Sequence, residues 1–153
     1  MVQLIDPFFK IMGAGLVAVT AAIILEAPRN SLNKITLLGA LSYTIYLLTL
    51  SFTSIVNAVF IACLSASLVA QAFARWFKMP VTIFYVPTFF LYVPGASIYK
   101  TAYYFINNQL DSTLFYLTET LLIAGAIALG VFISDSLLEI LKSLKSKTKG
   151  KAS

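Results

Sequence analysis

Apolar residues gather in five long runs separated by short polar segments, at about 8–25, 35–52, 55–74, 81–106 and 113–133. A helix rises ~1.5 Å per residue, so each run is long enough to cross a hydrocarbon core of ~30 Å. None of the runs shows the alternation over about ten residues that barrel strands require. The pattern predicts an all-α integral membrane protein with five transmembrane helices, built as a single transmembrane domain over 1–141.

The fourth run is interrupted near its midpoint by Pro94 and Gly95. Proline removes a backbone donor and clashes with the preceding turn, and glycine tolerates conformations that other residues avoid. We therefore expect two half-helices, the second beginning near Ala96, with the break enclosed by protein or a water-filled cavity. The free amides of the second half-helix would offer an anion site near the middle of the membrane. The simpler alternative is a proline kink followed by a lysine that extends toward the interface.

Polar side chains follow this break on one predicted helix face. Ser97, Lys100 and Tyr104 are spaced by three and four residues, which places them on the same side of a helix. Glu119 is the one acid well inside the fifth run, at a depth similar to that of Lys100. A charge at that depth costs roughly 2.5–3.5 kcal/mol, so we expect these two charges to pair.

Small residues recur every four positions in the first and third runs. The longer ridge is Ala58, Ala62, Ala66, Ala70 and Ala74, and the shorter one is Ala14, Ala18 and Ala22. Such ridges let another helix approach closely, so both are predicted to be packing surfaces. Asn57 and Gln71 of the third run are expected to form hydrogen bonds between helices, with contact to substrate as the alternative. A polar stripe along the second run, from Gly39 to Thr53, either lines a path or serves helix contacts.

Basic residues of the loops lie on one side of the predicted membrane, and Lys10 alone is mildly discordant. Arg29, Lys34, Arg75 and Lys78 fall in loops on the same side as the C-terminal lysines, whereas the loops at 51–54 and 107–112 carry no basic residue. The positive-inside rule then places the N-terminus outside and the C-terminus in the cytoplasm. Of the net charge of +5, much comes from a basic cytoplasmic tail at 142–153. That tail is predicted to contact membrane lipids rather than nucleic acid.

Composition excludes several classes of protein. The chain is 59% hydrophobic and 11% charged, whereas soluble domains are about 25% charged. It has no histidine and one cysteine, which removes Cys-His nucleophiles and the usual transition-metal sites. Paired carboxylates for acid–base catalysis are not visible either. We therefore expect no enzyme activity, no cofactor and no metal.

Two stretches make the chain recognisable. The third run closes with QAFARWFKMP at 71–80, and the fourth carries Pro87 and then VPGASIY at 93–99, a Pro-Gly-x-x-x-Tyr pattern. With the five-run outline over about 10–135, these motifs resemble the threonine/serine exporter family, and within it the small-subunit half. The family pattern requires no charge at Lys100 or Glu119. The candidate substrate-binding residues are Pro94, Gly95, Ala96, Ser97, Tyr99, Lys100, Tyr104 and Glu119.

The resemblance implies export of small carboxylates, either threonine and serine or a dicarboxylate such as succinate. It implies a secondary transporter in a bacterial inner membrane, coupled to the proton motive force. A small subunit of this kind would act with a larger exporter subunit of the same family, in a homo- or hetero-oligomer. The alternative from another class is a non-transporting membrane scaffold, for which the alanine ridge of the third run would suffice.

Overall fold

The computed structural model describes the backbone of residues 2–150 and the side chains of residues 6–140. Within that range the protein is helical and contains no strand, which confirms the all-α prediction. The elements in chain order are α1 (Val2–Ile24), the short 3-10 turn η1 (Arg29–Ser31), α2 (Leu32–Leu50), α3 (Ile55–Phe77), α4 (Thr82–Phe89), α5 (Gly95–Ile106) and α6 (Leu110–Gly150). The side chains of the predicted basic tail lie outside the described part of the chain.

Among the described residues, three helices are long and apolar enough to cross a membrane. They are Asp6–Ile24 in α1, Ile55–Phe77 in α3 and Leu110–Ile140 in α6. The five-helix count and the orientation remain predictions, because α4 and α5 are only 8 and 12 residues long and α2 does not reach the same apolar content. At the start of the chain, Pro7 lies inside α1, and Asp6 pairs with Lys10 at 3.1 Å.

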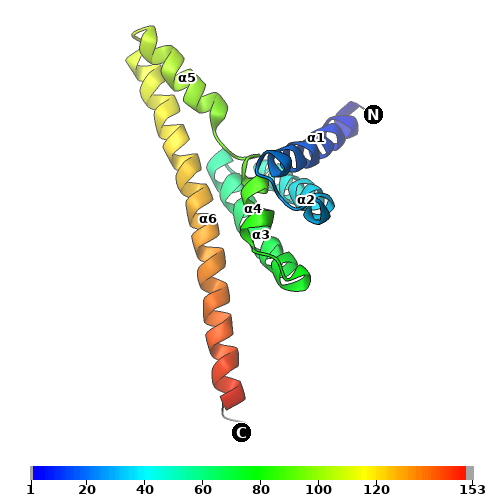
Figure 1. Ribbon diagram of the computed structural model, residues 1–153. Helices are drawn as coiled ribbons and strands as arrows, with labels where there is room; N and C mark the ends of the chain where they lie inside the picture. The colour runs from blue at the N-terminus through cyan, green and yellow to red at the C-terminus, as the bar shows by residue number, and fades with distance from the viewer. Residues whose placement is uncertain (1, 151–153) are drawn as a thin grey trace.

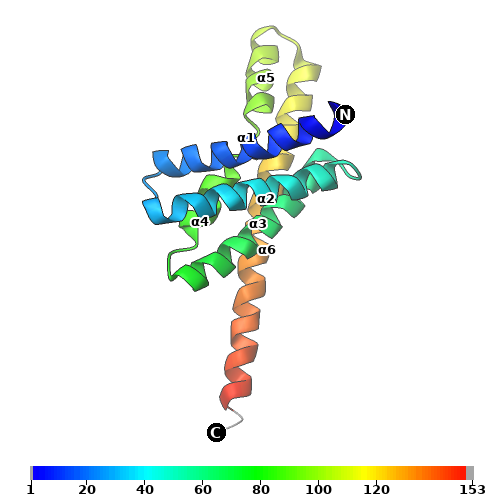
Figure 2. The same ribbon diagram turned by 90° about the vertical axis from the view of Figure 1, so that its right-hand side faces the viewer.

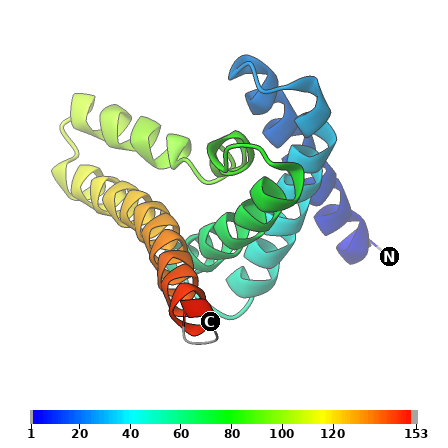
Figure 3. The ribbon, with the colours of Figure 1, turned by 60° about the horizontal axis from the view of Figure 1, so that its bottom comes forward.

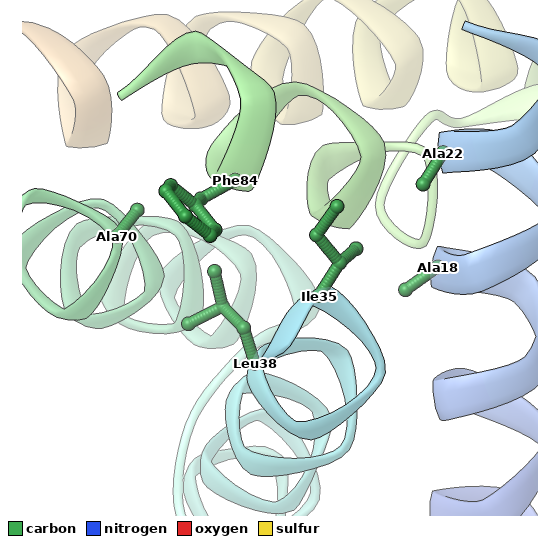
Figure 4. Packing of buried hydrophobic residues seen from close by; sticks show 6 residues of the cluster. All are labelled: Ala18, Ala22, Ile35, Leu38, Ala70 and Phe84. Atoms are coloured by element: carbon green, nitrogen blue, oxygen red, sulfur yellow. The ribbon is translucent and has the colours of Figure 1, made fainter. Parts of the chain in front are cut away.

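Helices α1, α2, α3 and α4 form one bundle (Figure 1). Its core is built where Phe84 of α4 enters between α2 and α3 (Figure 4). Ile35 and Leu38 of α2 fill the space between Phe84 and the alanines of α1. Burial of these apolar side chains stabilises the bundle, at about 1.5–3 kcal/mol for each large one.

Small residues set the closest helix contacts in the bundle. Ala14, Ala18 and Ala22 of α1 are 4%, 0% and 0% exposed, which confirms the shorter ridge as a packing surface. A Cβ atom added to Gly39 of α2 would lie 2.5 Å from the Cβ of Ala18 and 3.3 Å from the carbonyl oxygen of Ala14. The two helices therefore touch at a point where only glycine fits.

The alanine ridge of α3 is also buried. Ala58, Ala62, Ala66 and Ala70 are at most 1% exposed. On the same helix, the backbone of Leu64 and the Cβ of Cys63 would each lie 3.1 Å from a Cβ added to Gly130 of α6. Small residues thus let α6 cross α3 closely, and Figure 2 shows α6 running across the layer formed by α1, α2 and α3.

Helices α5 and α6 form a hairpin that leaves the bundle. Among the described helices, α5 packs extensively against α6 alone and buries none of its own residues. Figures 1 and 3 show α5 and the first half of α6 extending away from α1 and α2. The turn between them uses a left-handed residue, Asn108 with φ 56°, and the amide of Gln109 donates to the carbonyl oxygen of Tyr104 at 2.9 Å. This arrangement ends α5 and reverses the chain.

Candidate functional site

The chain between α4 and α5 is held in the bundle by Tyr92. Its hydroxyl donates to Ser42 Oγ of α2 at 2.9 Å, and its ring packs 5.7 Å from that of Tyr46. Tyr92 is 5% exposed and lies in a second cluster with Cys63 of α3 and Ile123 of α6. One side chain therefore ties this connection to three helices. Ser42 and Tyr46 belong to the polar stripe of α2. Their bonds favour the interpretation that this stripe serves helix contacts rather than lining a path.

Helix α5 begins at Gly95, one residue before the predicted start, and has no side-chain cap. The amide of Gly95 donates to the carbonyl oxygen of Val93 at 2.7 Å, and that of Ile98 donates to Pro94 at 2.9 Å. The amides of Ala96 and Ser97 find no acceptor among the described residues. Two backbone donors, together with the positive end of the helix dipole, are thus available to an anion. Gly95 itself does not contribute a free amide, which corrects the expectation for the whole first turn.

Ser97 and Lys100 both face α6, but they meet different residues there. Ser97 Oγ donates to Glu119 Oε2 at 2.8 Å. The ammonium of Lys100 lies 4.8 Å from the centre of the Tyr116 ring. This distance suits a cation–π interaction.

The predicted ion pair between Lys100 and Glu119 is wrong. Among the described side chains the ion pair within 4.0 Å is Asp6–Lys10. The reason is register: α5 and α6 run in opposite directions, so a contact between Ser97 and Glu119 brings Lys100 opposite Tyr116. The depth estimate was in error by about one helical turn.

The two tyrosines among the candidate residues lie differently. Tyr104 stacks on Tyr116, with ring centres 5.4 Å apart and an angle of 2° between the planes. Tyr99 is 69% exposed and stacks on Tyr103 instead, 6.3 Å away. The structure therefore brings Ser97, Lys100 and Tyr104 together on the face toward α6 and leaves Tyr99 outside it.

The site is open on one side. Ala96 is exposed, Ser97 and Glu119 are half-buried, and Lys100 is exposed. Glu119 also lines a groove of about 440 Å³ with Val56 of α3 and Leu114, Phe115, Thr118 and Leu122 of α6. The described side chains hold no group of three or more His, Cys, Asp or Glu residues that could bind a metal ion. The arrangement can bind a small polar ligand through amides, a cation and a carboxylate.

Sequence analysis did not identify two residues of this region, Tyr116 and Tyr92. Tyr116 lies three residues before Glu119, at the same helical spacing that identified the face of α5. That spacing could have suggested it. Tyr92 has no comparable signal, because its partner Ser42 is fifty residues away in the chain.

Comparison with known proteins places most of the chain in one family. Residues 10–137 match the family model described as "Threonine/Serine exporter, ThrE". The match includes all of α2 to α5 and α6 as far as residue 137, and therefore every residue of the candidate site. Neither the curated proteins nor the solved structures compared with the chain match it.

Proposed function

The chain belongs to the threonine/serine exporter family, and from that premise we propose that it is the small subunit of a secondary transporter that exports small carboxylates. Threonine and serine are the first candidates for the cargo, and a dicarboxylate such as succinate is the other. The larger subunit of the same family is its partner, and a bacterial inner membrane is its location. Apolar helices long enough to span a bilayer support the membrane setting.

The start of α5 carries this proposal. Unpaired amides at Ala96 and Ser97 supply donors for a carboxylate, and Lys100 adds a positive charge one turn later. Interrupted helices whose N-terminal ends face anionic groups recur among secondary transporters. The substrate carboxylate would bind here, with Pro94 and Gly95 keeping the end of the helix free.

Glu119 gives the site a preference between the two cargoes. Its carboxylate lies beside Ser97, the residue that also provides one of the free amides. An amino acid that binds the amides through its carboxylate would bring its ammonium group close to Glu119. Succinate has no ammonium group and would bring a second negative charge, which Glu119 would repel. The chemistry favours a hydroxy amino acid.

The open side of the hairpin supports a partner subunit. Helix α5 buries no residue, and Ile98, Tyr103 and Phe105 are half or more exposed. A transport site needs walls on every side to exclude water and to alternate access. We infer that the larger subunit covers the exposed side of α5 and completes the site.

The scaffold alternative loses the observation on which it depended. The alanine ridge of α3 was its basis, as a surface for an external helix. Four of those alanines are covered by helices of this same chain. A partner that docks on the ridge would have to displace them.

The test is efflux of labelled threonine and succinate from preloaded cells that express the chain with its larger partner. Gly95→Leu is the informative variant, because a Cβ at Gly95 meets nothing within 4 Å and the fold has room for it. We expect at least a tenfold loss of efflux, equivalent to ~1.4 kcal/mol, since the new side chain blocks approach to the amides. Gly125→Leu, at an equally open glycine of α6, is the matched control. Normal efflux from a well-folded Gly95→Leu complex would exclude this site from transport.

A further inference from the structure

A second group of polar residues lies where α3 crosses α6, away from Ser97 and Glu119. Ser67 of α3 and Ser134 of α6 are both 0% exposed. Within the side chains described, neither hydroxyl has a hydrogen-bond partner. A buried polar group without a partner is destabilising, and native proteins rarely keep one without a reason.

These two serines differ from the other buried hydroxyls of the described residues, which all form a hydrogen bond. Ser65, on the same helix as Ser67, donates to the carbonyl oxygen of Ala62 at 2.9 Å, and Ser42 donates to that of Gly39 at 3.1 Å. That local bond is the usual way in which a helix satisfies a serine. The hydroxyls of Ser67 and Ser134 form no such bond, so each is available to a ligand.

The contacts on either side place the two serines at the same crossing. Gly130 of α6 lies against Cys63 and Leu64, and Ser134 and Ser67 follow one turn after Gly130 and Cys63. Beyond them, Gln71 of α3 donates from its side-chain amide to Asp135 of α6. This bond also confirms the predicted interhelical role of Gln71, whereas Asn57 is exposed and its side chain forms no bond to another helix among the described residues. Ser67 and Ser134 therefore lie between the closest backbone contact and a carboxylate.

The available ligand atoms are oxygens around one negative charge. Asp135 forms no ion pair with any lysine or arginine of the described side chains. Water would satisfy the hydroxyls but leave the carboxylate without a counter-charge. A hard cation satisfies both, and a single carboxylate suits a monovalent ion better than a divalent one, which normally takes several. Asp135 is exposed, so an ion can enter from its side.

We propose that Ser67, Ser134 and Asp135 form a Na⁺ site at the crossing of α3 and α6, with Gln71 positioning the carboxylate. Glu119 and Asp135 are sixteen residues apart on one helix, or ~24 Å at ~1.5 Å per residue. No single threonine molecule spans that distance. The ion is therefore bound separately from the cargo, and the proposal stands without the proposed transport function.

The experiment measures the melting temperature of the full chain, purified in detergent, in NaCl and in choline chloride of equal ionic strength. A ligand that binds only the folded state raises the melting temperature with its concentration. We expect a sodium-specific rise of about 3 °C at concentrations well above the dissociation constant. Asp135→Asn and Ser67→Ala should abolish this rise. Ser65→Ala, whose hydroxyl bonds within its own helix, should keep it.

The serine variants distinguish a Na⁺ site from serine hydroxyls that are buried without a ligand. If Ser67 holds nothing, Ser67→Ala removes an unsatisfied hydroxyl and raises the melting temperature equally in both salts. That result would overturn the proposal. Equal melting temperatures of the unaltered chain in both salts would also overturn it, as would a sodium effect that survives in Asp135→Asn. Because none of these measurements involves transport, a failure here leaves the efflux test undecided and independent.

Discussion

In the proposed transport site, Glu119 is the side chain on which the choice of cargo would depend. It accepts a hydrogen bond from Ser97 at 2.8 Å and has no cationic partner among the described residues. Its charge is therefore free to meet the ammonium group of an amino acid. Lys100, opposite Tyr116, is free to meet a carboxylate in the same way.

Glu119→Gln should separate threonine from succinate. The amide oxygen still accepts from Ser97, so the fold keeps its contact, but the negative charge is lost. We expect threonine efflux to fall about tenfold, because a hydrogen bond to a charged group contributes about 1.5–3 kcal/mol. Succinate efflux should stay equal or rise. Thr118→Asn, on the neighbouring exposed position of α6, is the control. Equal losses for both cargoes would contradict the assignment of Glu119 to the ammonium group.

Residue-level reasoning from sequence placed Ser97, Lys100 and Tyr104 on one face correctly, because the 3.6-residue period of a helix fixes which side chains share a side. It failed on the partner of Lys100. Which residue of α6 lies opposite depends on the length and shape of the 107–109 turn, and a shift of three residues exchanges Glu119 for Tyr116. Such a register cannot be read from hydrophobic pattern alone.

Helix crossings at small residues are the main packing device at the level of elements. Gly39 meets Ala18 between α2 and α1, and Gly130 meets Cys63 between α6 and α3. The alanine ridges could be predicted as packing surfaces from the sequence, because four-residue spacing of small side chains is typical of close helix contacts. The sequence did not show which helix covers each ridge, since that depends on the tertiary arrangement.

Gly39→Ala should disrupt the crossing of α1 and α2. Its new methyl group would lie 2.5 Å from Ala18 Cβ and 3.3 Å from a backbone oxygen, so the helices must separate, at a cost of roughly 1–3 kcal/mol. The double variant Gly39→Ala, Ala18→Gly removes the closer clash and should recover part of the melting temperature. Gly13→Ala, which meets nothing within 4 Å, should be neutral or stabilising. Additive losses in the double variant would show that the two residues do not touch.

Helix α4 ends at Phe89 and α5 begins at Gly95, and the role of Pro94 and Gly95 in breaking a membrane span stays a prediction. The anchoring of the connection by Tyr92 was not predictable, because it depends on a contact with α2 across the bundle. Asp135 and Glu139 end the apolar run, but polar residues do not end a helix, and α6 continues to Gly150.

At the level of the whole molecule, the sequence predicts an orientation through its charged loops, and the α5–α6 hairpin gives that orientation a testable form. The turn at Asn107 to Gln109 lies at one end of the hairpin and the lysine-rich tail follows the other end of α6. The two ends should face opposite sides of the membrane. The departure of the hairpin from the bundle was not visible in the sequence, because an exposed apolar helix face looks the same whether lipid or protein covers it.

Cysteine labelling in intact cells checks the orientation. Asn108→Cys should react with a membrane-impermeant thiol reagent, because the basic residues of the other loops predict that this turn lies outside. Ser146→Cys should react only after the cells are opened. The unaltered chain, with buried Cys63 as its one thiol, gives the background. Labelling of Ser146→Cys alone in intact cells would reverse the proposed orientation.

Because Cys63 is buried at the α3–α6 crossing, the rate at which it reacts with a thiol reagent reports how often the two helices separate. A reagent reaches the sulfur only while the two helices are apart, so its reaction rate equals the rate of a free thiol multiplied by the fraction of time spent open. A change of ~1.4 kcal/mol in the free energy of opening alters that rate tenfold. A transport cycle that moves α6 against α3 would change the rate when cargo binds. A transport cycle confined to α5 would leave the reaction rate of Cys63 constant. That rate therefore distinguishes rigid-body rocking of α6 against α3 from local gating at α5.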